Sequence, residues 1–195
     1  MEPTLFLLTG FPGIGKFTVA RSLAKQIEAA GETVRVVDNH WINNPIFGLV
    51  AQDGMTPLPS AVWERVGEVA EAVICTVEEL TPRAWQVIFT AYLDGVTDTG
   101  YAPRLTAVAE SRGSVFAPVR LLCDPEENAR RIVSSERRDR MKSIDPHEPF
   151  RLATDGEPYH PGHPNTLTLD ITTMPPDEAA ANILAHAVEM AGRHG

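Results

Sequence analysis

The apolar positions of the chain form short continuous runs that alternate with longer stretches of helical spacing. Runs of this length are typical of buried strands, and apolar residues three or four positions apart predict helices. The expected strands span residues 5–9, 33–37, 85–90, 115–123 and 166–171. The expected helices span residues 16–30, 60–80, 103–112 and 176–192, and a further helix begins after residue 124. Strands that alternate with helices predict parallel β-α-β units and an α/β sandwich.

One stretch late in the chain lacks this periodicity. Residues 139–165 contain five prolines and two glycines, and we expect no regular structure there. A loop of that length within a compact domain is usually functional.

Length and composition restrict the classes of protein that remain. The 195 residues fit one domain, and 43% hydrophobic residues are enough for its own core. A net charge of −9 disfavours nucleic-acid binding, so no nucleic-acid partner is expected. No apolar run reaches the roughly 18 residues of a membrane helix, and the first residues lack the positive charge of a signal peptide. Cys75 and Cys123 stand apart from any metal-binding pair, which favours reduced thiols and a cytoplasmic protein.

The first expected strand runs directly into a glycine-rich segment. This segment reads Gly10, Phe11, Pro12, Gly13, Ile14, Gly15, Lys16, Phe17 and Thr18. Glycines between a strand and a helix let backbone N–H groups curl around a phosphate, and the helix points its positive end at the same anion. Lys16 then reaches the β- and γ-phosphates as a mobile charge. The structural alternative is a simple strand-to-helix turn with an exposed lysine.

The spacing Gly-x-Pro-Gly-x-Gly-Lys-x-Thr resembles the P-loop of the adenylate kinase/shikimate kinase-like group. This group of small-molecule kinases includes gluconate kinase and chloramphenicol phosphotransferase-like enzymes. The resemblance is specific at residues 10–18 and covers most of the chain in layout. It implies a three-layer P-loop kinase-like sandwich, with a five-stranded parallel sheet in the order 2-3-1-4-5. Within a single domain of residues 1–195, it implies an acceptor-binding segment at about 39–84 and a lid at about 137–165.

The resemblance also implies that ATP and Mg²⁺ are the cofactors. Residues 10–18 would bind ATP, and Lys16 would act in catalysis. Phe17 stands where the common pattern has the serine or threonine that holds Mg²⁺, and Thr18 follows one position later. Thr18 is therefore the expected metal contact, and whether it binds Mg²⁺ directly or through water stays open.

The end of the second expected strand carries the candidate acceptor site. Asp38 stands there, and ligands of open parallel sheets bind at the carboxyl ends of strands. Its expected role is to orient the acceptor hydroxyl, with deprotonation as an open alternative. Asp38 could instead cap the helix that follows. His40 is either a second candidate base or, as we favour, a packing residue. The third strand ends in Thr90, where many P-loop proteins carry an acid.

The acceptor-binding segment holds few cations. Arg65 and Arg83 are its two, whereas a nucleoside monophosphate needs several arginines around its phosphate. This shortage favours an acceptor that has hydroxyls and no phosphate. Trp41 and Trp63 could stack on a ring of the acceptor, although tryptophan at helical spacing is more often part of the core.

Six cations are concentrated after the fourth strand. They are Arg130, Arg131, Arg137, Arg138, Arg140 and Lys142. The resemblance assigns an arginine late in this helix to adenine, which we carry to Arg131. It assigns a lid arginine to the γ-phosphate, which we carry to Arg137 with Arg138 as the rival. A solvated basic end of a helix is the alternative for the whole cluster.

These observations favour an ATP-dependent phosphotransferase that acts on a hydroxyl of a small molecule. The alternatives are a nucleoside or nucleoside monophosphate kinase, and a nucleotide-binding P-loop regulator without transfer activity. The expected partner is the small-molecule acceptor alone, with no membrane, and the protein is expected to be a monomer or homodimer.

Overall fold

Five parallel strands form one sheet through the centre of the molecule. The structure is a computed structural model, and it describes residues 1–51, 53, 56–96, 98–133 and 143–192. The strands are β1 Thr4–Thr9, β2 Val34–Asp38, β3 Gln86–Ala91, β4 Val115–Leu122 and β5 Leu167–Asp170. They lie in the order β2-β3-β1-β4-β5, so the expected topology is confirmed.

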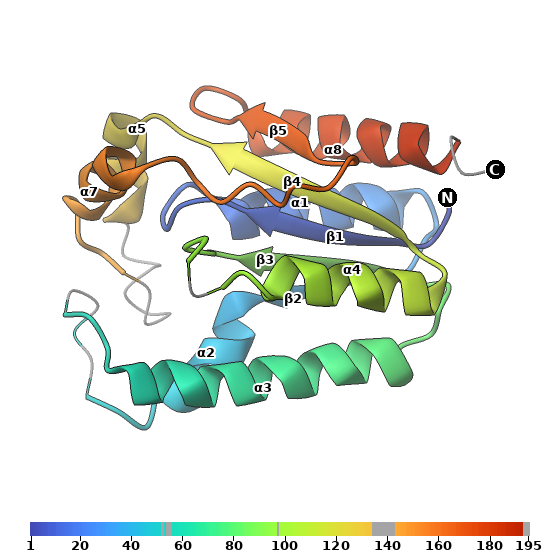
Figure 1. Cartoon of the computed structure of the whole chain (residues 1–195). Helices are drawn as coiled ribbons and strands as arrows, with labels where there is room; N and C mark the ends of the chain where they lie inside the picture. The colour runs from blue at the N-terminus through green and yellow to red at the C-terminus, as the bar shows by residue number, and fades with distance from the viewer. Residues whose placement is uncertain (52, 54–55, 97, 134–142, 193–195) are drawn as a thin grey trace.

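Helices cover both faces of this sheet, which makes a three-layer sandwich (Figure 1). Helices α1 Lys16–Ala29 and α8 Pro176–Ala191 pack together on one face. Helices α2 Asn39–Phe47, α3 Ser60–Glu79 and α4 Tyr101–Arg112 cover the other face. Two short helices, α5 Pro125–Ile132 and α7 Glu148–Asp155, pack against each other near the carboxyl ends of the strands.

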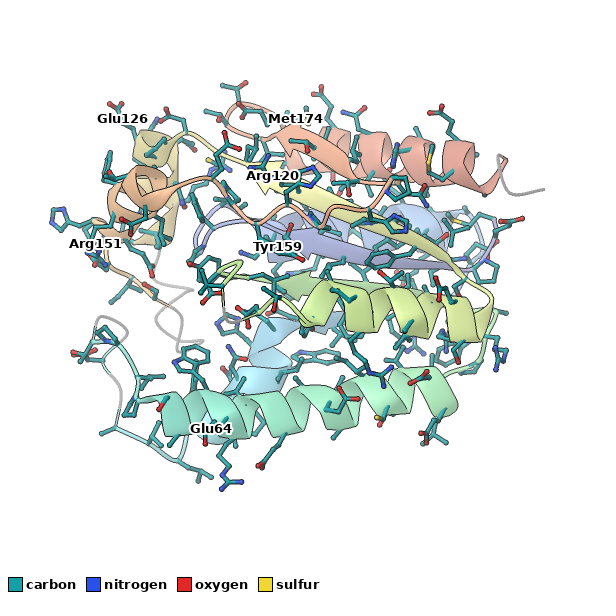
Figure 2. All side chains as sticks on the ribbon, viewed as in Figure 1. Glu64, Arg120, Glu126, Arg151, Tyr159 and Met174 are labelled. Atoms are coloured by element: carbon teal, nitrogen blue, oxygen red, sulfur yellow. The ribbon has the colours of Figure 1, made fainter. Side chains whose placement is uncertain are left out.

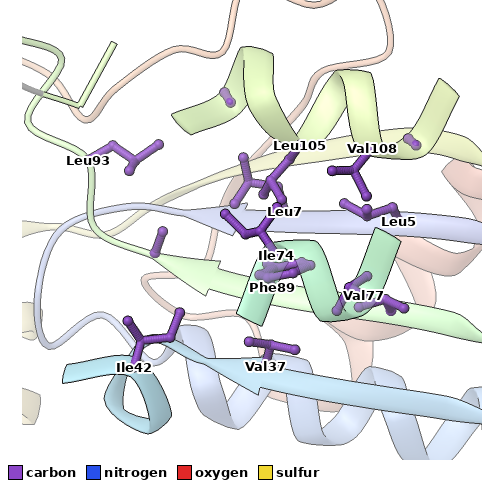
Figure 3. Close-up of a cluster of buried hydrophobic side chains, with 14 of the residues drawn as sticks. Leu5, Leu7, Val37, Ile42, Ile74, Val77, Phe89, Leu93, Leu105 and Val108 are labelled. Atoms are coloured by element: carbon purple, nitrogen blue, oxygen red, sulfur yellow. The ribbon is translucent and has the colours of Figure 1, made fainter. Parts of the chain in front are cut away.

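The core has two parts because side chains of a strand alternate between the two faces of the sheet. Leu5 and Leu7 of β1 belong to the cluster under α3 and α4, which Figure 3 shows. Phe6 and Leu8 belong to the cluster under α1 and α8. All six residues of β1 are buried, so the strand holds the P-loop that follows it in a fixed position.

Helix α5 begins as its sequence predicts. The Asp124 side chain accepts hydrogen bonds from the backbone N–H groups of Glu126 at 2.9 Å and Glu127 at 3.2 Å, and Pro125 takes the first helical position. This capping fixes the place at which the chain turns back toward the P-loop.

Two helices were not among the expected ranges, although a helix after Asp38 was considered. The polar stretch after Asp38 forms α2, although Pro45 lies inside it. The expectation that residues 139–165 contain no regular structure is wrong, because α7 lies within them. Pro149 is near the start of α7, where a missing N–H costs no helical hydrogen bond.

Residues 156–166, which we call the strap, cross the sheet from α7 to β5 without forming a helix (Figure 1). Arg120 Nε of β4 donates a hydrogen bond to the Pro158 carbonyl at 2.9 Å, and Asn165 Nδ2 donates one to the Phe116 carbonyl at 3.0 Å. Tyr159 packs against the core cluster of α3 and α4; Figure 2 labels it together with Arg120. The strap is therefore anchored to the sheet although it forms no helix or strand.

None of the helices in the described part of the chain is long and apolar enough to cross a membrane.

Candidate functional site

The loop between β1 and α1 adopts a conformation that its glycines permit. Gly10, Gly13 and Gly15 have φ angles of 147°, 92° and 108°, which L side chains rarely adopt. A Cβ atom on Gly10 would come within 2.6 Å of the Leu121 carbonyl oxygen, and one on Gly13 within 3.0 Å of Ile132. The loop is thus wedged between α1, the end of β4 and α5.

Lys16 is the first residue of α1 and folds back over this loop. Its Nζ donates hydrogen bonds to the carbonyl oxygens of Gly10 at 2.8 Å and Phe11 at 2.9 Å. Gly15 occupies the N-cap position, and no side chain caps α1. The positive end of α1 and the Lys16 ammonium therefore converge on one loop, which is the arrangement that binds a phosphate chain.

A pocket of about 280 Å³ opens beside the loop, between α1, α5 and the turn from β5 to α8. Its lining residues are Ile14, Gly15, Thr18, Val19, Arg131, Ile171, Met174 and Pro176. Most of the lining side chains are apolar, and Arg131 is the cation among them. The volume is close to the lower end of the range of small-molecule pockets, roughly 300 Å³.

Arg131 ties α5 to both other walls of this pocket. Its Nη1 donates to the Ile14 carbonyl at 2.8 Å, and its Nη2 donates to the carbonyls of Ile171 at 3.0 Å and Thr172 at 2.8 Å. Glu127, one turn earlier on α5, accepts from Arg131 Nε at 2.8 Å. The planar guanidinium is therefore held in place at the pocket wall.

Phe17 and Thr18, the two residues after Lys16, differ in exposure and in what they contact. Thr18 is exposed and lines the pocket with Arg131. Phe17 is half-buried, and the Arg21 guanidinium lies 5.9 Å from its ring centre. Of the two, Thr18 is the one with a hydroxyl, and it faces the pocket.

Asp38 ends β2 and is only 4% exposed. Its Oδ1 accepts a hydrogen bond of 2.6 Å from Thr90 Oγ1, and Thr90 is the β3 residue paired with Asp38 in the sheet. The side chain of Asp38 makes no capping hydrogen bond to α2, so the capping alternative is wrong. Alternation along β2 and β3 directs Asp38 and Thr90 to the face of the sheet that α1 covers, because Val36 and Ile88 pack there.

The first residues of α2 join this pair. His40 Nδ1 lies 2.8 Å from Asn39 Oδ1 and 3.7 Å from Asp38 Oδ2. The Asn39 backbone N–H donates to Thr90 Oγ1 at 3.3 Å. Thr90, Asp38, His40 and Asn39 thus form a closed ring of polar contacts, which we call the Asp38 ring.

The aromatic and cationic side chains of the acceptor-binding segment lie near the surface. Trp41 is 64% exposed and Trp63 is 49% exposed, so the expectation that they belong to the core is wrong. Trp63 makes an edge-to-face contact with Phe47 at 5.5 Å between ring centres. Arg65 forms an ion pair with Glu68 of its own helix, and Arg83 donates to the Ser111 carbonyl.

The loop after β3 contributes acids and a tyrosine near the P-loop. Asp94 accepts hydrogen bonds from the backbone N–H groups of Val96 and Asp98, and this use of its carboxylate stabilises its own loop. Tyr92 makes an edge-to-face contact with Phe11 of the P-loop at 6.4 Å. Burial raises the pKa of Tyr92, and the carboxylates of Asp94 and of Glu148 on α7 raise it further. Acids of the loop after β3 and of α7 are therefore both close enough to Tyr92 to affect its pKa.

Arg137 and Arg138, the expected lid arginines, lie outside the described residues.

The histidines of the strap contribute to its turns: His160 Nδ1 accepts from the Gly162 N–H and His163 Nδ1 from the Asn165 N–H. Among the residues that the structure describes, no group of three or more His, Cys, Asp or Glu side chains could hold a metal ion.

Sequence reasoning missed two polar residues of this region. Thr90 was noted only because many P-loop proteins have an acid at the end of this strand. In the structure its hydroxyl donates a hydrogen bond to Asp38. Arg120 gave no signal because it lies within an apolar strand. Its side chain is 10% exposed and pairs at 2.6 Å with Glu157 of the strap, which is 83% exposed. A charged residue inside an otherwise buried strand is the signal that could have identified Arg120.

Comparisons with known proteins identify the fold. A scan against protein-family models finds no match. A search of curated protein sequences finds no relative. Solved structures do match over nearly the whole chain. The APS kinase CysC from Mycobacterium tuberculosis, in complex with AMPPNP and APS, has a TM-score of 0.63 at 15% identity, over 95% of this chain and 97% of that protein.

Two further matches have similar coverage. A gluconokinase from Sinorhizobium meliloti has a TM-score of 0.58 at 16% identity, over 98% of this chain and 95% of its own. Kti12 from Chaetomium thermophilum, in complex with ADP-AlF3, has a TM-score of 0.59 at 16% identity, over 95% and 98%. The chain therefore has the fold of the P-loop kinases, and the resemblance inferred from its glycine-rich motif is confirmed at the level of the fold.

Proposed function

We propose that this protein is an ATP-dependent kinase that transfers the γ-phosphoryl group to a hydroxyl of a small molecule. The observation that carries the proposal is the Lys16 ammonium folded over the P-loop, beside a pocket of about 280 Å³ that Gly15 and Thr18 help to line. Phosphoryl transfer needs mainly positioning and charge stabilisation, and this edge of the sheet offers groups for both.

The nucleotide fits the pocket with its base toward Arg131. The guanidinium plane can stack on a purine, and Ile171, Met174 and Pro176 supply apolar contacts opposite (Met174 is labelled in Figure 2). The triphosphate would then follow Thr18 and Gly15 onto the amides of residues 10–15, where Lys16 exchanges its carbonyl partners for the β- and γ-phosphates. Nucleotide-bound structures of two neighbours, with AMPPNP and with ADP-AlF3, support a nucleotide on this fold.

Mg²⁺ fits this site as an ion held mostly by the phosphates and water. The described residues offer no cluster of acidic, histidine or cysteine ligands, and Mg²⁺ commonly takes only one or two protein contacts at phosphate sites. Thr18, exposed in the first turn of α1, would contribute its hydroxyl directly or through water. When bound, the ion would neutralise charge on the phosphates. Arg137 is proposed to stabilise the transferred group from the lid.

The acceptor is proposed to lie beside Asp38, at the carboxyl ends of β2 and β3 and next to the first residues of α2. Asp38 orients its hydroxyl for attack on the γ-phosphorus. Arg65 and Arg83, the two cations of residues 39–84, are both engaged with other groups of the described chain, which favours an acceptor that carries hydroxyls and no phosphate. The exposed rings of Trp41 and Trp63 are available to stack on such a molecule.

A second candidate is a nucleotide-binding P-loop protein that hydrolyses ATP without an acceptor. The observation that favours it is the hydroxyl of Thr90 at the end of β3, in place of an acid. A nucleoside or nucleoside monophosphate kinase is the less favoured alternative, given the engaged arginines.

The proposal is tested by measuring ADP release from Mg-ATP against a panel of hydroxylated metabolites that includes nucleosides and nucleoside monophosphates. We expect one acceptor class to accelerate ADP release and to become phosphorylated. Lys16→Ala should abolish transfer and weaken ATP binding with an unchanged fold, because the variant loses the charge over the phosphates. Lys25→Ala is the control, since Lys25 is exposed further along the same helix.

ADP release that no acceptor stimulates would favour the second candidate. Transfer by Lys16→Ala at the parental rate would show that the P-loop assignment is wrong.

A further inference from the structure

Thr172 lies in the turn after β5, just beyond the residues that pair β5 with β4. The Ile171 N–H donates a hydrogen bond to the Leu122 carbonyl at 2.9 Å. One residue further along, Thr172 Oγ1 accepts a hydrogen bond from the Asp124 backbone N–H at 2.9 Å. The threonine side chain therefore continues the contact between the two segments as far as the residue that caps α5.

The direction of the Thr172 hydroxyl is set by Asp170. Thr172 Oγ1 donates to Asp170 Oδ1 at 2.6 Å, and the Thr172 backbone N–H donates to the same oxygen at 2.8 Å. Both hydrogen bonds lower the pKa of Asp170, and the one from the hydroxyl has the larger effect. Because the hydroxyl proton is used on Asp170, the oxygen meets the Asp124 N–H as an acceptor.

The backbone of the same turn is joined to the other end of α5. Arg131, in the last turn of this helix, donates through Nη2 to the carbonyls of Thr172 at 2.8 Å and Ile171 at 3.0 Å. Asp124 and Arg131 are about 10 Å apart along the helix axis. The turn is thus attached to α5 near both of its ends, and it cannot shift along the helix without breaking one of these contacts.

This turn supplies two of the four hydrogen bonds that the Arg131 side chain makes within the described chain. The other two go to the Ile14 carbonyl of the P-loop and to Glu127 on α5 itself. Ile171 and Met174 line the pocket from the same turn. The place of the guanidinium at the pocket wall, and of the apolar side chains opposite it, therefore depends on where this turn lies.

We propose that Thr172 is a positioning residue of the nucleotide site: its hydroxyl holds the turn after β5 to the start of α5 and so keeps Arg131 in the plane on which the base stacks. The inference rests on the proposed function, since it deepens the nucleotide site described there. Thr172 is not among the residues that line the pocket, and it acts through Arg131.

Two substitutions at this position separate the hydroxyl from the shape of the side chain. Thr172→Val keeps the shape but can neither donate to Asp170 nor accept from Asp124, whereas Thr172→Ser keeps the hydroxyl. We expect Thr172→Val to raise the Kd of AMPPNP, measured by calorimetry without acceptor, about fivefold, the scale of one lost hydrogen bond. Thr172→Ser should stay within about twofold of the wild type.

Thr166→Val is the matched control. The Thr166 hydroxyl is also hydrogen-bonded, to the His163 carbonyl at 2.6 Å, but it lies before β5 and away from the pocket lining. This variant should leave the Kd of AMPPNP unchanged.

A double-mutant cycle distinguishes positioning of Arg131 from a general loosening of the fold. Once Arg131→Met has removed the guanidinium, adding Thr172→Val should raise the Kd by less than about twofold. A fivefold rise in both backgrounds, an unchanged Kd in Thr172→Val, or a Thr172→Ser protein as weak as Thr172→Val would overturn the role of Thr172 while nucleotide binding stands. A wild-type protein that does not bind AMPPNP would overturn the nucleotide site itself and this role with it.

Discussion

At the scale of single residues, the P-loop depends on glycines that leave no room for a side chain. Gly13 lies against α5, where Asn128 and Ile132 fill the space that a Cβ atom would enter. Asn128 Oδ1 is buried there, and within the described residues it has no hydrogen-bond partner. Contact and backbone conformation therefore restrict this position to glycine.

Gly13→Ala should accordingly distort the loop. A φ of 92° costs an alanine about 1–2 kcal/mol, and the contact with Ile132 adds to this strain. We expect AMPPNP affinity, measured by calorimetry, to fall at least about tenfold. Gly67→Ala is the matched control in the middle of α3, where nothing lies within 4 Å of the new Cβ. This control should raise stability by about 0.5–1 kcal/mol and leave nucleotide binding unchanged.

Asp38→Asn separates charge from hydrogen bonding at the same scale. An asparagine oxygen can still accept from Thr90, but the negative charge beside His40 is lost. Turnover should fall roughly 10²-fold while ATP affinity stays within about tenfold. If melting temperature falls and the turnover of the folded fraction is unchanged, Asp38 is a structural residue.

The shape of the loop at residues 10–15 could be predicted from the sequence because its signals are local: the glycines and Lys16 lie directly between a strand and a helix. Thr90 could not, because its role depends on a partner from another strand. The exposure of Trp41 and Trp63 was also mispredicted, because helical spacing indicates which residues share a face and not whether another element covers that face.

At the scale of elements, α5 braces the loop on which the nucleotide is proposed to lie. Arg131 joins it to the carbonyls of Ile14, Ile171 and Thr172. Its capped start was readable from the sequence, since Asp124 and Pro125 lie next to each other in the chain. The extent of α2 was not, because its first residues are polar and Pro45 lies inside it.

Arg131→Met should loosen this brace. The thioether keeps part of the apolar stem but leaves three carbonyl oxygens without their donor, which should cost about 1–3 kcal/mol of the free energy of unfolding. Nucleotide affinity should fall about tenfold, as both the stacking plane and the pocket wall change. Arg130→Met is the control on the same helix, because the Arg130 side chain is 75% exposed and pairs with Glu127 alone among the described residues. Equal losses in the two variants would contradict a specific role for Arg131.

At the scale of the whole molecule, the order of the strands places the loops together. Parallel strands end at one edge, so the P-loop after β1, Asp38 after β2 and the acids after β3 meet there although they are far apart in the sequence. This arrangement followed from the alternation of strands and helices together with the resemblance at residues 10–18. The packing of residues 143–166 did not, because contacts such as that of Arg120 with Pro158 link segments with no shared pattern.

These contacts divide the described part of the predicted lid into two segments that should behave differently. The strap is held to the sheet by Arg120 and Asn165, so its amides should exchange slowly with or without ligand. Helix α7 packs mainly on α5, and Phe150 on its surface is 44% exposed. The carboxylates of Glu148 and Asp155 raise the pKa of Tyr92, so α7 lies near the loop after β3. A short helix that packs mainly on one other short helix of the described chain has little buried area to offset the entropy of ordering it.

We therefore expect α7 to respond to ligands and the strap not to. Hydrogen exchange measured on the free protein, with AMPPNP, and with AMPPNP plus the acceptor from the panel should show exchange in α7 slowing by about tenfold or more only when both ligands are bound, because closure excludes water from the transferred group. Gly67 and its neighbours on α3 provide an internal reference that should not change. If α7 is as protected in the free protein as in the ternary complex, it is a fixed wall of the cleft, and closure around the phosphates must come from another part of the chain.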